Sequence, residues 1–508
     1  MSRFNSVATN PRRTTNHEGD VAYYGLDPEQ QLYAITSCNL LQNGFYSSKD
    51  KSIESILNLI PKCDAIFVAK LAEYLRHEMY LRSTPMVLLA TLGLDGKLTA
   101  DMIPPVVARA DEIKELLGAW QAISGNTTLK KIPNALKKGI AECFNKFDGY
   151  HFRKYNKQGK EAISFKDAVY ITHPKPNSKE KSELFKKILE DNLDPITTWE
   201  VNISAAGSNP DKKREAWEKL LLEKKLPYMA ALRNIRNILK AQVSERAITA
   251  LLELLENREQ ILRSKQFPFR WYSACKQLNM DMDPNILLHL NSINRVLESA
   301  ITTSIANIPG IERLREESSL IACDVSGSMQ TPLSDRSSLD LIEIGILLGK
   351  MLNKVSNRTI TGVFGNDWSP VSFGTTVLDS VNYPHVGLAT YGYKVIKWLT
   401  QNKIHVDNVM YFSDSQIYSD LGLNNGYGYG SPSGSARSAL EISWNEYKKF
   451  HPAARIYMFD LSSYGTTPID LLSRDVYMMN GWSSNIFKVL GGLQDWKSLK
   501  NYIISFTH

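Results

Sequence analysis

An uninterrupted apolar run that ends in an aspartate most constrains how this 508-residue chain can fold. Residues 320–323 are apolar and lead into Asp324, with Ser326 and Ser328 two and four positions further on. Because the run has no polar alternation, it predicts a strand buried on both faces, as in parallel sheets. Ligands of open α/β sheets bind beyond the carboxyl ends of the strands, so these three side chains lie where a site is expected. Their hard oxygens favour Mg²⁺, with Mn²⁺ or Ca²⁺ as alternatives.

Strand and helix patterns alternate along the sequence from this run onward. The predicted strands are residues 320–323, 359–364, 406–412 and 455–461, and the predicted helices are residues 341–352, 393–399 and 436–450. Alternation of this kind is typical of a parallel sheet covered by helices on both faces. We therefore predict an α/β domain over residues 315–508. A glycine-rich segment, residues 421–437, follows the third strand; it is either a loop over the site or an ordinary surface loop.

The preceding part of the chain has a different pattern. Residues 1–20 are polar and predict a mobile arm. From about residue 21 to 314, apolar residues recur at helical spacing and are interrupted by prolines, as in the stripe Leu226, Met229, Leu232, Ile235 and Leu239. Many short helices over this length favour an irregular, HEAT-like solenoid of helix pairs over one compact bundle. The predicted fold is thus α followed by α/β.

The cysteines and the charge limit the classes of function. Five dispersed cysteines without a Cys-x-x-Cys pair argue against a zinc ribbon and favour a reducing compartment. No signal-like or membrane-spanning apolar run is present, so we expect a cytoplasmic protein without membrane contact. Residues 315–508 contain 16 basic and 17 acidic residues, whereas residues 130–190 contain 15 and 7. The basic excess of the chain is therefore concentrated in one helical stretch.

That basic stretch is a candidate surface for a polyanion. Lysines neutralise phosphates and aromatic side chains stack on unpaired bases, and here Phe152 and Tyr155 lie among the lysines. The candidate contact residues are Lys137, Lys138, Arg153, Lys154, Lys157 and Lys160. A solvated helix face would have the same composition, so charge alone leaves both interpretations open. Arg233 lies off the apolar stripe of its predicted helix and is either an RNA contact or a structural ion-pair residue.

The Asp-x-Ser-x-Ser spacing of Asp324, Ser326 and Ser328 resembles the metal-ion-dependent adhesion site (MIDAS) of von Willebrand factor A domains. That motif also uses a distant threonine and a distant aspartate, for which Thr390 and Asp414 are the candidates. The five residues would hold one divalent cation. Alternatively Asp324 is only a helix N-cap. An aspartyl phosphotransferase is disfavoured because Ser326 stands where a second carboxylate is needed.

Helical repeats followed by such a domain resemble the Ro autoantigen, or TROVE-domain, family. Residues 229–235, Met-Ala-Ala-Leu-Arg-Asn-Ile, are similar to its Thr-Ala-Leu-Leu-Arg-Asn-Leu signature, and residues 167–176 are similar to a segment that ends in His-Pro-Lys-Pro. Residues 40–46 resemble, more loosely, a Gly-Gly-x-Tyr-Tyr element. The resemblance spans the chain from about residue 20. It differs at residues 163–165, where the family tends to place an aromatic–His pair.

The resemblance implies a ring of helices closed by the A domain. It further implies that small noncoding Y RNAs bind a basic outer surface, and that single-stranded 3′ ends of misfolded RNAs enter a central hole. Lys154 and His173 match positions of the family's Y-RNA surface, and either Lys157 or Lys160 matches the next basic position.

These observations predict a monomeric RNA-binding scaffold in noncoding-RNA stability or quality control, without catalytic chemistry. An exoribonuclease or another protein could bind through the metal site. The alternative is a metal-dependent protein-interaction adaptor with no physiological RNA ligand. RNA hydrolysis is disfavoured because no general base or second metal cluster accompanies the predicted ion.

Overall fold

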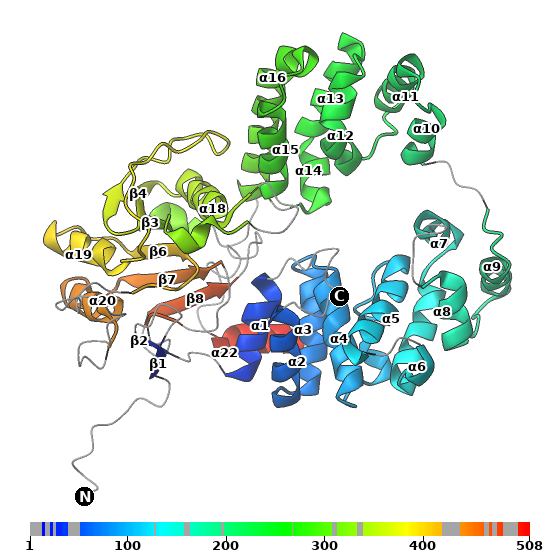
Figure 1. Ribbon diagram of the computed structural model, residues 1–508, viewed down its shortest axis with the longest axis horizontal. Helices are drawn as coiled ribbons and strands as arrows, with labels where there is room; N and C mark the ends of the chain where they lie inside the picture. The colour runs from blue at the N-terminus through cyan, green and yellow to red at the C-terminus, as the bar shows by residue number, and fades with distance from the viewer. Residues whose placement is uncertain are drawn as a thin grey trace, which may run out of the picture. The chain divides into compact units, whose positions relative to one another are not determined.

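The computed structural model divides the chain into two compact units (Figure 1). The first unit comprises residues 1–26 and 199–494, and the second comprises residues 27–198 and 495–508. The residues described are 13–15, 21–23, 27–38, 51–125, 129–156, 163–194, 198–266, 268–306, 312–332, 339–418, 437–461, 467–469, 475–480 and 496–508.

The second unit is helical. Its helices are α1 (Pro28–Cys38), α2 (Lys51–Leu59), α3 (Ala65–His77), α4 (Ser83–Leu94), α5 (Ala110–Ser124), α6 (Asn134–Cys143), α7 (Gly149–Tyr155), α8 (Phe165–Thr172), α9 (Lys179–Leu189) and α22 (Trp496–Ser505), with short 3₁₀ turns between some of them. Side chains at the helix ends explain several boundaries. Asp64 caps α3 by accepting from the Phe67 N–H, and Ser164 and Asp167 form a capping box that starts α8. Helix α4 is apolar on nearly all sides and is buried between α3 and α5.

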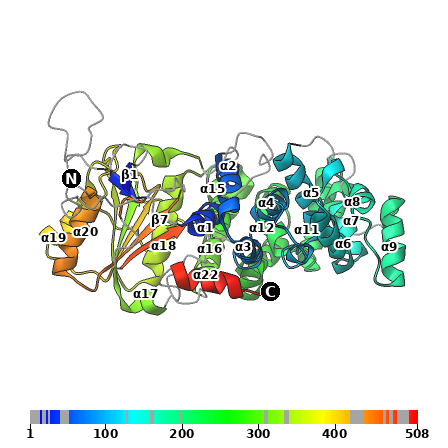
Figure 2. The same cartoon turned by 90° about the horizontal axis from the view of Figure 1, so that it is seen from below.

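Helix α22 completes the core of this unit although it is distant in sequence (Figure 1, Figure 2). The Trp496 indole N–H donates to Asp27 at 2.8 Å, and its ring lies edge-on to Phe67. Near the end of the chain, Tyr502 and Phe506 both contact the ring of buried Tyr74. The helices at the start of this unit therefore share their core with a segment more than 400 residues further along the chain, after residue 494.

From residue 199 on, the first unit consists of helices followed by a sheet domain. The helices are α10 (Trp199–Ala205), α11 (Pro210–Leu222), α12 (Tyr228–Lys240), α13 (Glu245–Glu256), α14 (Arg258–Ser264), α15 (Phe269–Asn279), α16 (Pro284–Ala306) and α17 (Glu312–Glu316). Helix α16 contacts α12, α13, α14 and α15, and so forms the centre of this helical part. It also contacts the sheet domain, because Glu298 accepts from the Val377 and Leu378 N–H groups and pairs with Lys354.

Within the described residues the sheet has six strands in the order β5-β4-β3-β6-β7-β8. These are β3 (Ser318–Asp324), β4 (Arg358–Phe364), β5 (Trp368–Pro370), β6 (Asn408–Ser413), β7 (Arg455–Asp460) and β8 (Val476–Asn480). All neighbours are parallel except β4 and β5. In β3, Leu320 and Ala322 belong to the core formed with α19 (Tyr393–Gln401) and α20 (Ala439–Phe450). Ile321 and Cys323 lie against Gly349 of α18 (Leu341–Val355), where a side chain would not fit, so both faces of the strand are buried.

The predicted fold, helices followed by a largely parallel α/β sheet, is confirmed. The structure adds the short antiparallel β5, strand β8 and helix α22, which the pattern did not predict. Within the polar segment 1–20, residues Arg13–Thr15 form β1 and pair with β2 (Val21–Tyr23). Lone short strands carry too few apolar residues to produce a periodic signal.

The boundary at residue 315 and the closure of the helices into a ring stay predictions. Of the described cysteines, Cys63, Cys143, Cys275 and Cys323 are buried free thiols. Among the described helices, none is long and apolar enough to cross a membrane.

Candidate functional site

Asp324 is the last residue of the central strand β3, and its carboxylate is fully buried. Its Oδ1 accepts from the Ser326 N–H at 2.9 Å, and its Oδ2 accepts from the Ser413 hydroxyl at 2.6 Å. The chain then turns, and the Ser326 and Ser328 hydroxyl oxygens lie 3.3 Å apart. The three predicted residues of this segment therefore direct oxygen atoms into one small region.

The site lies where the strand order of the sheet reverses. The chain passes from β3 to β4 on one side and later returns to β6 on the other, so the loops after β3 and β6 diverge. A crevice at the carboxyl ends of the strands is expected at such a switch point. Asp324 ends β3 and Asp414 directly follows β6, and both side chains are buried.

Three loops that meet here are joined by backbone hydrogen bonds. The Gly327 N–H donates to the Leu388 carbonyl at 3.0 Å, and the Tyr418 N–H donates to the Thr390 carbonyl at 3.1 Å. These two bonds join the Asp324, Thr390 and Asp414 loops to one another. All five predicted metal ligands thus lie in segments that the structure brings together.

The loop before Thr390 is shaped by a glycine. Gly387 has φ +82°, and a Cβ on it would lie 2.2 Å from the Asn366 side chain. In this close approach, Asn366 Oδ1 accepts from the Ala389 N–H at 2.8 Å. The side chain of Asn366, which sequence reasoning missed, therefore fixes the backbone next to Thr390.

The electrostatics of the site favour a cation. Burial, and then the negative charge of Asp414, raise the pKa of Asp324 from 3.8 to about 7, against the opposing hydrogen bonds from Ser326 and Ser413. A divalent ion would offset both effects. Within the described residues there is no cluster of three or more carboxylate, imidazole or thiol groups that could hold a metal. The ligand set predicted from the sequence, two carboxylates with the Ser326, Ser328 and Thr390 hydroxyls, consists of hard oxygen donors, which suit Mg²⁺.

The predicted RNA contacts of the basic stretch lie on α6, α7 and α8. These helices share an aromatic core, in which Phe152 of α7 stacks on Phe144 and meets Phe165 of α8 edge-on at 5.1 Å. Lys138, Lys154 and His173 are exposed, and we call these three residues the basic surface; Lys137 and Arg153 are half-buried. Lys157 and Lys160 lie outside the described residues, as do residues 421–436 of the predicted glycine-rich loop.

His173 occupies a special backbone position. It ends α8 as a C-cap in the left-handed region with φ 48°, and its N–H donates to the Val169 carbonyl at 2.9 Å. Its backbone therefore has a capping role, while its side chain is exposed and free to contact a ligand.

The aromatic part of the prediction requires correction. Phe152 is fully buried and cannot stack on a base. One face of the Tyr155 ring is occupied by the Arg109 guanidinium, 4.5 Å from the ring centroid. Tyr150, which the sequence analysis did not select, is 48% exposed, and Lys154 Nζ lies 5.7 Å from its ring centroid. The stacking candidate on α7 is therefore Tyr150.

Arg233 belongs to the other unit, on α12, and its side chain is exposed. It is therefore not one of the three residues of the basic surface.

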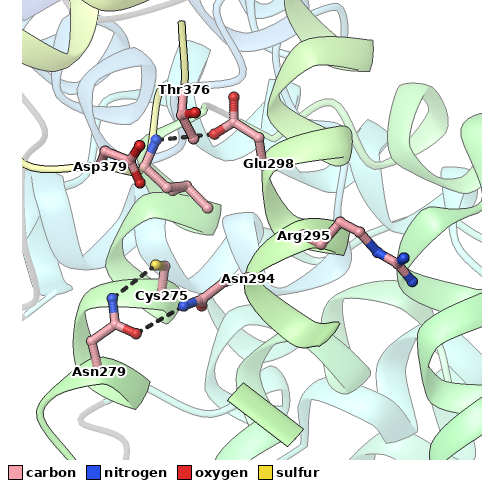
Figure 3. Close-up of a pocket in the computed structure, with 8 residues that line it drawn as sticks. Cys275, Asn279, Asn294, Arg295, Glu298, Thr376 and Asp379 are labelled. Atoms are coloured by element: carbon pink, nitrogen blue, oxygen red, sulfur yellow. Dashed lines mark hydrogen bonds between the residues drawn. The ribbon is translucent and has the colours of Figure 1, made fainter. Parts of the chain in front are cut away.

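A cavity of about 280 Å³ lies between α15, α16 and residues 376–379 (Figure 3). Asn279 donates to the Cys275 sulfur at 3.3 Å and accepts from Asn294 at 2.9 Å. Arg295 extends away from the other labelled residues. Because its polar wall groups largely bond to one another, the cavity is best explained as a gap in the packing between α16 and the sheet domain.

Comparison with known proteins identifies the helical part of the first unit. The family model described as "TROVE domain" matches residues 192–318. Residues 192–318 are therefore similar to the TROVE domain. The match covers α10 to α17 and the first residue of β3, so the resemblance to the Ro, or TROVE-domain, family is confirmed.

Similar proteins extend this comparison. Telomerase protein component 1 of Mus musculus is 39% identical over 77 residues, and that of Rattus norvegicus is 35% identical over 82 residues. These alignments cover 15% and 16% of this chain but only 3% of each relative. The crystal structure of the Ro (RSR) protein of Deinococcus radiodurans has a TM-score of 0.56 and 15% identity. That likeness covers 92% of this chain and all of the other, so the fold similarity extends well beyond the TROVE domain.

Proposed function

We propose that this chain is an RNA-binding scaffold of a ribonucleoprotein. The observation that supports this most is the basic surface, Lys138, Lys154 and His173, exposed on packed helices in a chain that is also similar to the TROVE domain. Residues 130–190 have 15 basic and 7 acidic residues, a net charge of +8, whereas residues 315–508 have a net charge of −1. A polyanion is therefore attracted to one part of the molecule.

The bound RNA is a small, structured, Y-like noncoding RNA. Lysines on helices α6 and α7 contact its phosphates, the exposed His173 contacts its backbone, and Tyr150 stacks on an unpaired base. A second RNA, the single-stranded 3′ end of a misfolded transcript, enters a central hole formed when the helices close into a ring. The monomeric protein would thus act in noncoding-RNA stability or quality control in the cytoplasm, without catalytic chemistry, and present RNA to an exoribonuclease.

Sequencing of RNA that copurifies with the chain tests this function. We expect enrichment of short noncoding RNAs, and a gel shift with one of them that weakens steeply as salt increases. Recovery of no RNA above a charge-matched control protein, together with no salt-sensitive shift, would refute the proposal.

The metal site supports a second function, recognition of a protein partner. When bound, a Mg²⁺ ion would supply a Lewis-acidic centre able to accept an acidic side chain. Asp324 and Asp414 would anchor the ion, and Ser326, Ser328 and Thr390 would orient it through neutral oxygens. As an alternative to RNA binding, the chain would be a metal-dependent adaptor. Capture of an acidic peptide that requires Mg²⁺, by a protein that fails to shift any RNA, would favour this alternative.

A further inference from the structure

Ser415 directly follows Asp414 in the loop after β6, and its backbone lies in the left-handed region with φ 63°. Residues other than glycine rarely adopt this conformation, because the Cβ atom then lies too close to the following carbonyl oxygen. Glycine would adopt it without this cost. A serine side chain is therefore present at a position where the backbone favours glycine.

The hydroxyl of this serine is buried and lacks a partner within the described part of the chain. Ser415 is 1% exposed, and its Oγ forms no hydrogen bond with any described residue. Burial removes the hydrogen bonds that a hydroxyl makes to water, so an unpaired one costs free energy. Most buried polar groups are satisfied by protein atoms, ordered water or ions. Two unfavourable features thus coincide at one residue next to a candidate metal ligand, as is typical of a functional position.

The loop holds Ser415 in this arrangement. Its N–H donates to the Ser413 hydroxyl oxygen at 3.1 Å. Two residues further on, Ile417 is buried and packs on Gly392, where an added Cβ would lie only 3.0 Å from the Ile417 side chain. Contacts on both sides of Ser415 therefore fix the backbone, and they oppose a rotation that would bring the hydroxyl to solvent.

The same contacts connect Ser415 to both candidate carboxylates. The Ser413 hydroxyl, which accepts from the Ser415 N–H, donates to Asp324 at 2.6 Å. Within Ser415 the nitrogen and Oγ are close neighbours, joined through Cα and Cβ, and Asp414 is the preceding residue. The hydroxyl of Ser415 therefore belongs to the small buried region in which Asp324, Asp414 and Ser326 lie.

We propose that Ser415 is a positioning residue of the candidate Mg²⁺ site, and that its hydroxyl accepts a hydrogen bond from a water molecule bound to the ion. The proposal rests on the metal site described under the proposed function. Mg²⁺ requires an octahedral set of oxygen ligands and usually keeps several waters. Water on a cation is a hydrogen-bond donor, and a serine hydroxyl offers lone pairs that accept. By holding such a water, Ser415 would raise the Mg²⁺ affinity of a site whose remaining predicted ligands include only two carboxylates.

Titration of the full chain with MgCl₂, followed by isothermal titration calorimetry, tests this role. The variants are Ser415→Gly and Ser415→Ala, which both remove the hydroxyl, although only glycine relieves the backbone strain. The matched control is Ser356→Ala. The Ser356 Oγ is likewise buried without a hydrogen-bond partner among the described residues, but it lies at the end of α18 before β4, at the opposite edge of the sheet from Asp324.

Both Ser415 variants should bind Mg²⁺ roughly tenfold more weakly than the parent, as is common when a group that orients a metal's ligands is removed. Ser356→Ala should bind as the parent does. Glycine suits the left-handed conformation better than serine, so a residue that only shapes the turn would be replaced by glycine without loss. Equal Mg²⁺ affinity of Ser415→Gly and the parent would therefore overturn the proposal.

Thermal unfolding without Mg²⁺ gives a second readout. Ser415→Ala should melt no lower than the parent, because the hydroxyl that it lacks makes no hydrogen bond to the described part of the fold. A lower Tm would assign the hydroxyl to the fold and overturn its role at the ion. If the parent binds Mg²⁺ and Asp324→Asn does not, unchanged binding by both Ser415 variants refutes Ser415 alone. Absence of Mg²⁺ binding by the parent would refute the metal site itself, and Ser415 with it.

Discussion

The Ser413 hydroxyl donates a hydrogen bond of 2.6 Å to the Asp324 carboxylate across the neighbouring strands β6 and β3. The same hydroxyl accepts from the Ser415 N–H at 3.1 Å. Ser413 therefore connects the end of one strand to the loop that carries Asp414, and it orients a carboxylate that has no access to solvent. The candidate metal site thus depends on a residue outside the five predicted ligands.

Replacement of Asp324 by Asn tests the metal site. The change keeps the shape of the side chain and removes one of two neighbouring buried negative charges, so Mg²⁺ binding measured by calorimetry should be lost. The metal-free variant should also be more stable than the metal-free parent, since repulsion from Asp414 is removed. Each kcal/mol of gain should raise Tm by about 2–4 °C.

The control for this experiment is thermal unfolding of both proteins with and without Mg²⁺. Only the parent should gain stability from the ion. If the Asn variant binds Mg²⁺ as tightly as the parent, the ion lies elsewhere.

Replacement of Lys138 and Lys154 together by Ala tests the basic surface. Both are exposed, so the fold should be unaffected. If each neutralises one phosphate, the log–log salt slope for a structured RNA should fall by about 1.5, and every RNA tested should bind more weakly. A double replacement of the exposed Lys225 and Lys449, which changes net charge equally, should leave the slope almost unchanged. Equal effects of the two double variants would mean that only net charge matters.

Phe152 and Tyr150 should give opposite results although they lie two residues apart on α7. Phe152→Ala removes the centre of the Phe144–Phe165 cluster and should cost about 3–5 kcal/mol in the free energy of unfolding, measured with urea. Tyr150→Ala should leave that free energy nearly unchanged and weaken unpaired RNA by about 1–3 kcal/mol. Loss of stability without any change in RNA binding would assign Tyr150 to the core.

His77 gives the second unit a pH dependence. Its ring stacks on His508 at 3.8 Å between centroids, and its Nε2 lies 2.8 Å from the Pro105 carbonyl oxygen. Burial, more than the nearby positive charges, lowers its pKa below the ordinary 6.5. The unfolded chain therefore binds more protons just below pH 6.5, so stability should fall as pH decreases through that value. His77→Gln should make the free energy of unfolding, measured with urea at about pH 5 and about pH 7, less dependent on pH. If the pH dependence is unchanged, His77 is not its source.

The sequence patterns predicted the strands of the sheet more accurately than the exposed residues of the basic surface. The apolar run at residues 320–323 requires burial on both faces, and only a central parallel strand provides this, so β3 was predictable to within two residues at its start. Asp324, Ser326 and Ser328 were placed with it because they follow the same strand. Their approach to Thr390 depends on the Gly327–Leu388 hydrogen bond and on Asn366, contacts between distant loops that no local pattern encodes.

The aromatic residues of α7 show the opposite case. Phe152 and Tyr150 both lie within four residues of Lys154, and only the packing of α7 on α8 decides which is buried.

The attachment of α22 to α1 and α3 has a consequence for the order in which the protein can mature. Translation produces residues 27–198 first, yet Tyr74 and Phe67 obtain part of their aromatic surroundings only from Trp496, Tyr502 and Phe506. Until α22 has been synthesised, the helices of residues 27–198 therefore expose apolar side chains to solvent. During this period chaperones and proteases compete for the nascent chain. A chain that terminates prematurely after residue 494 would retain every strand of the sheet and still expose that surface. Quality control of this protein during its own synthesis would thus depend on helix α22.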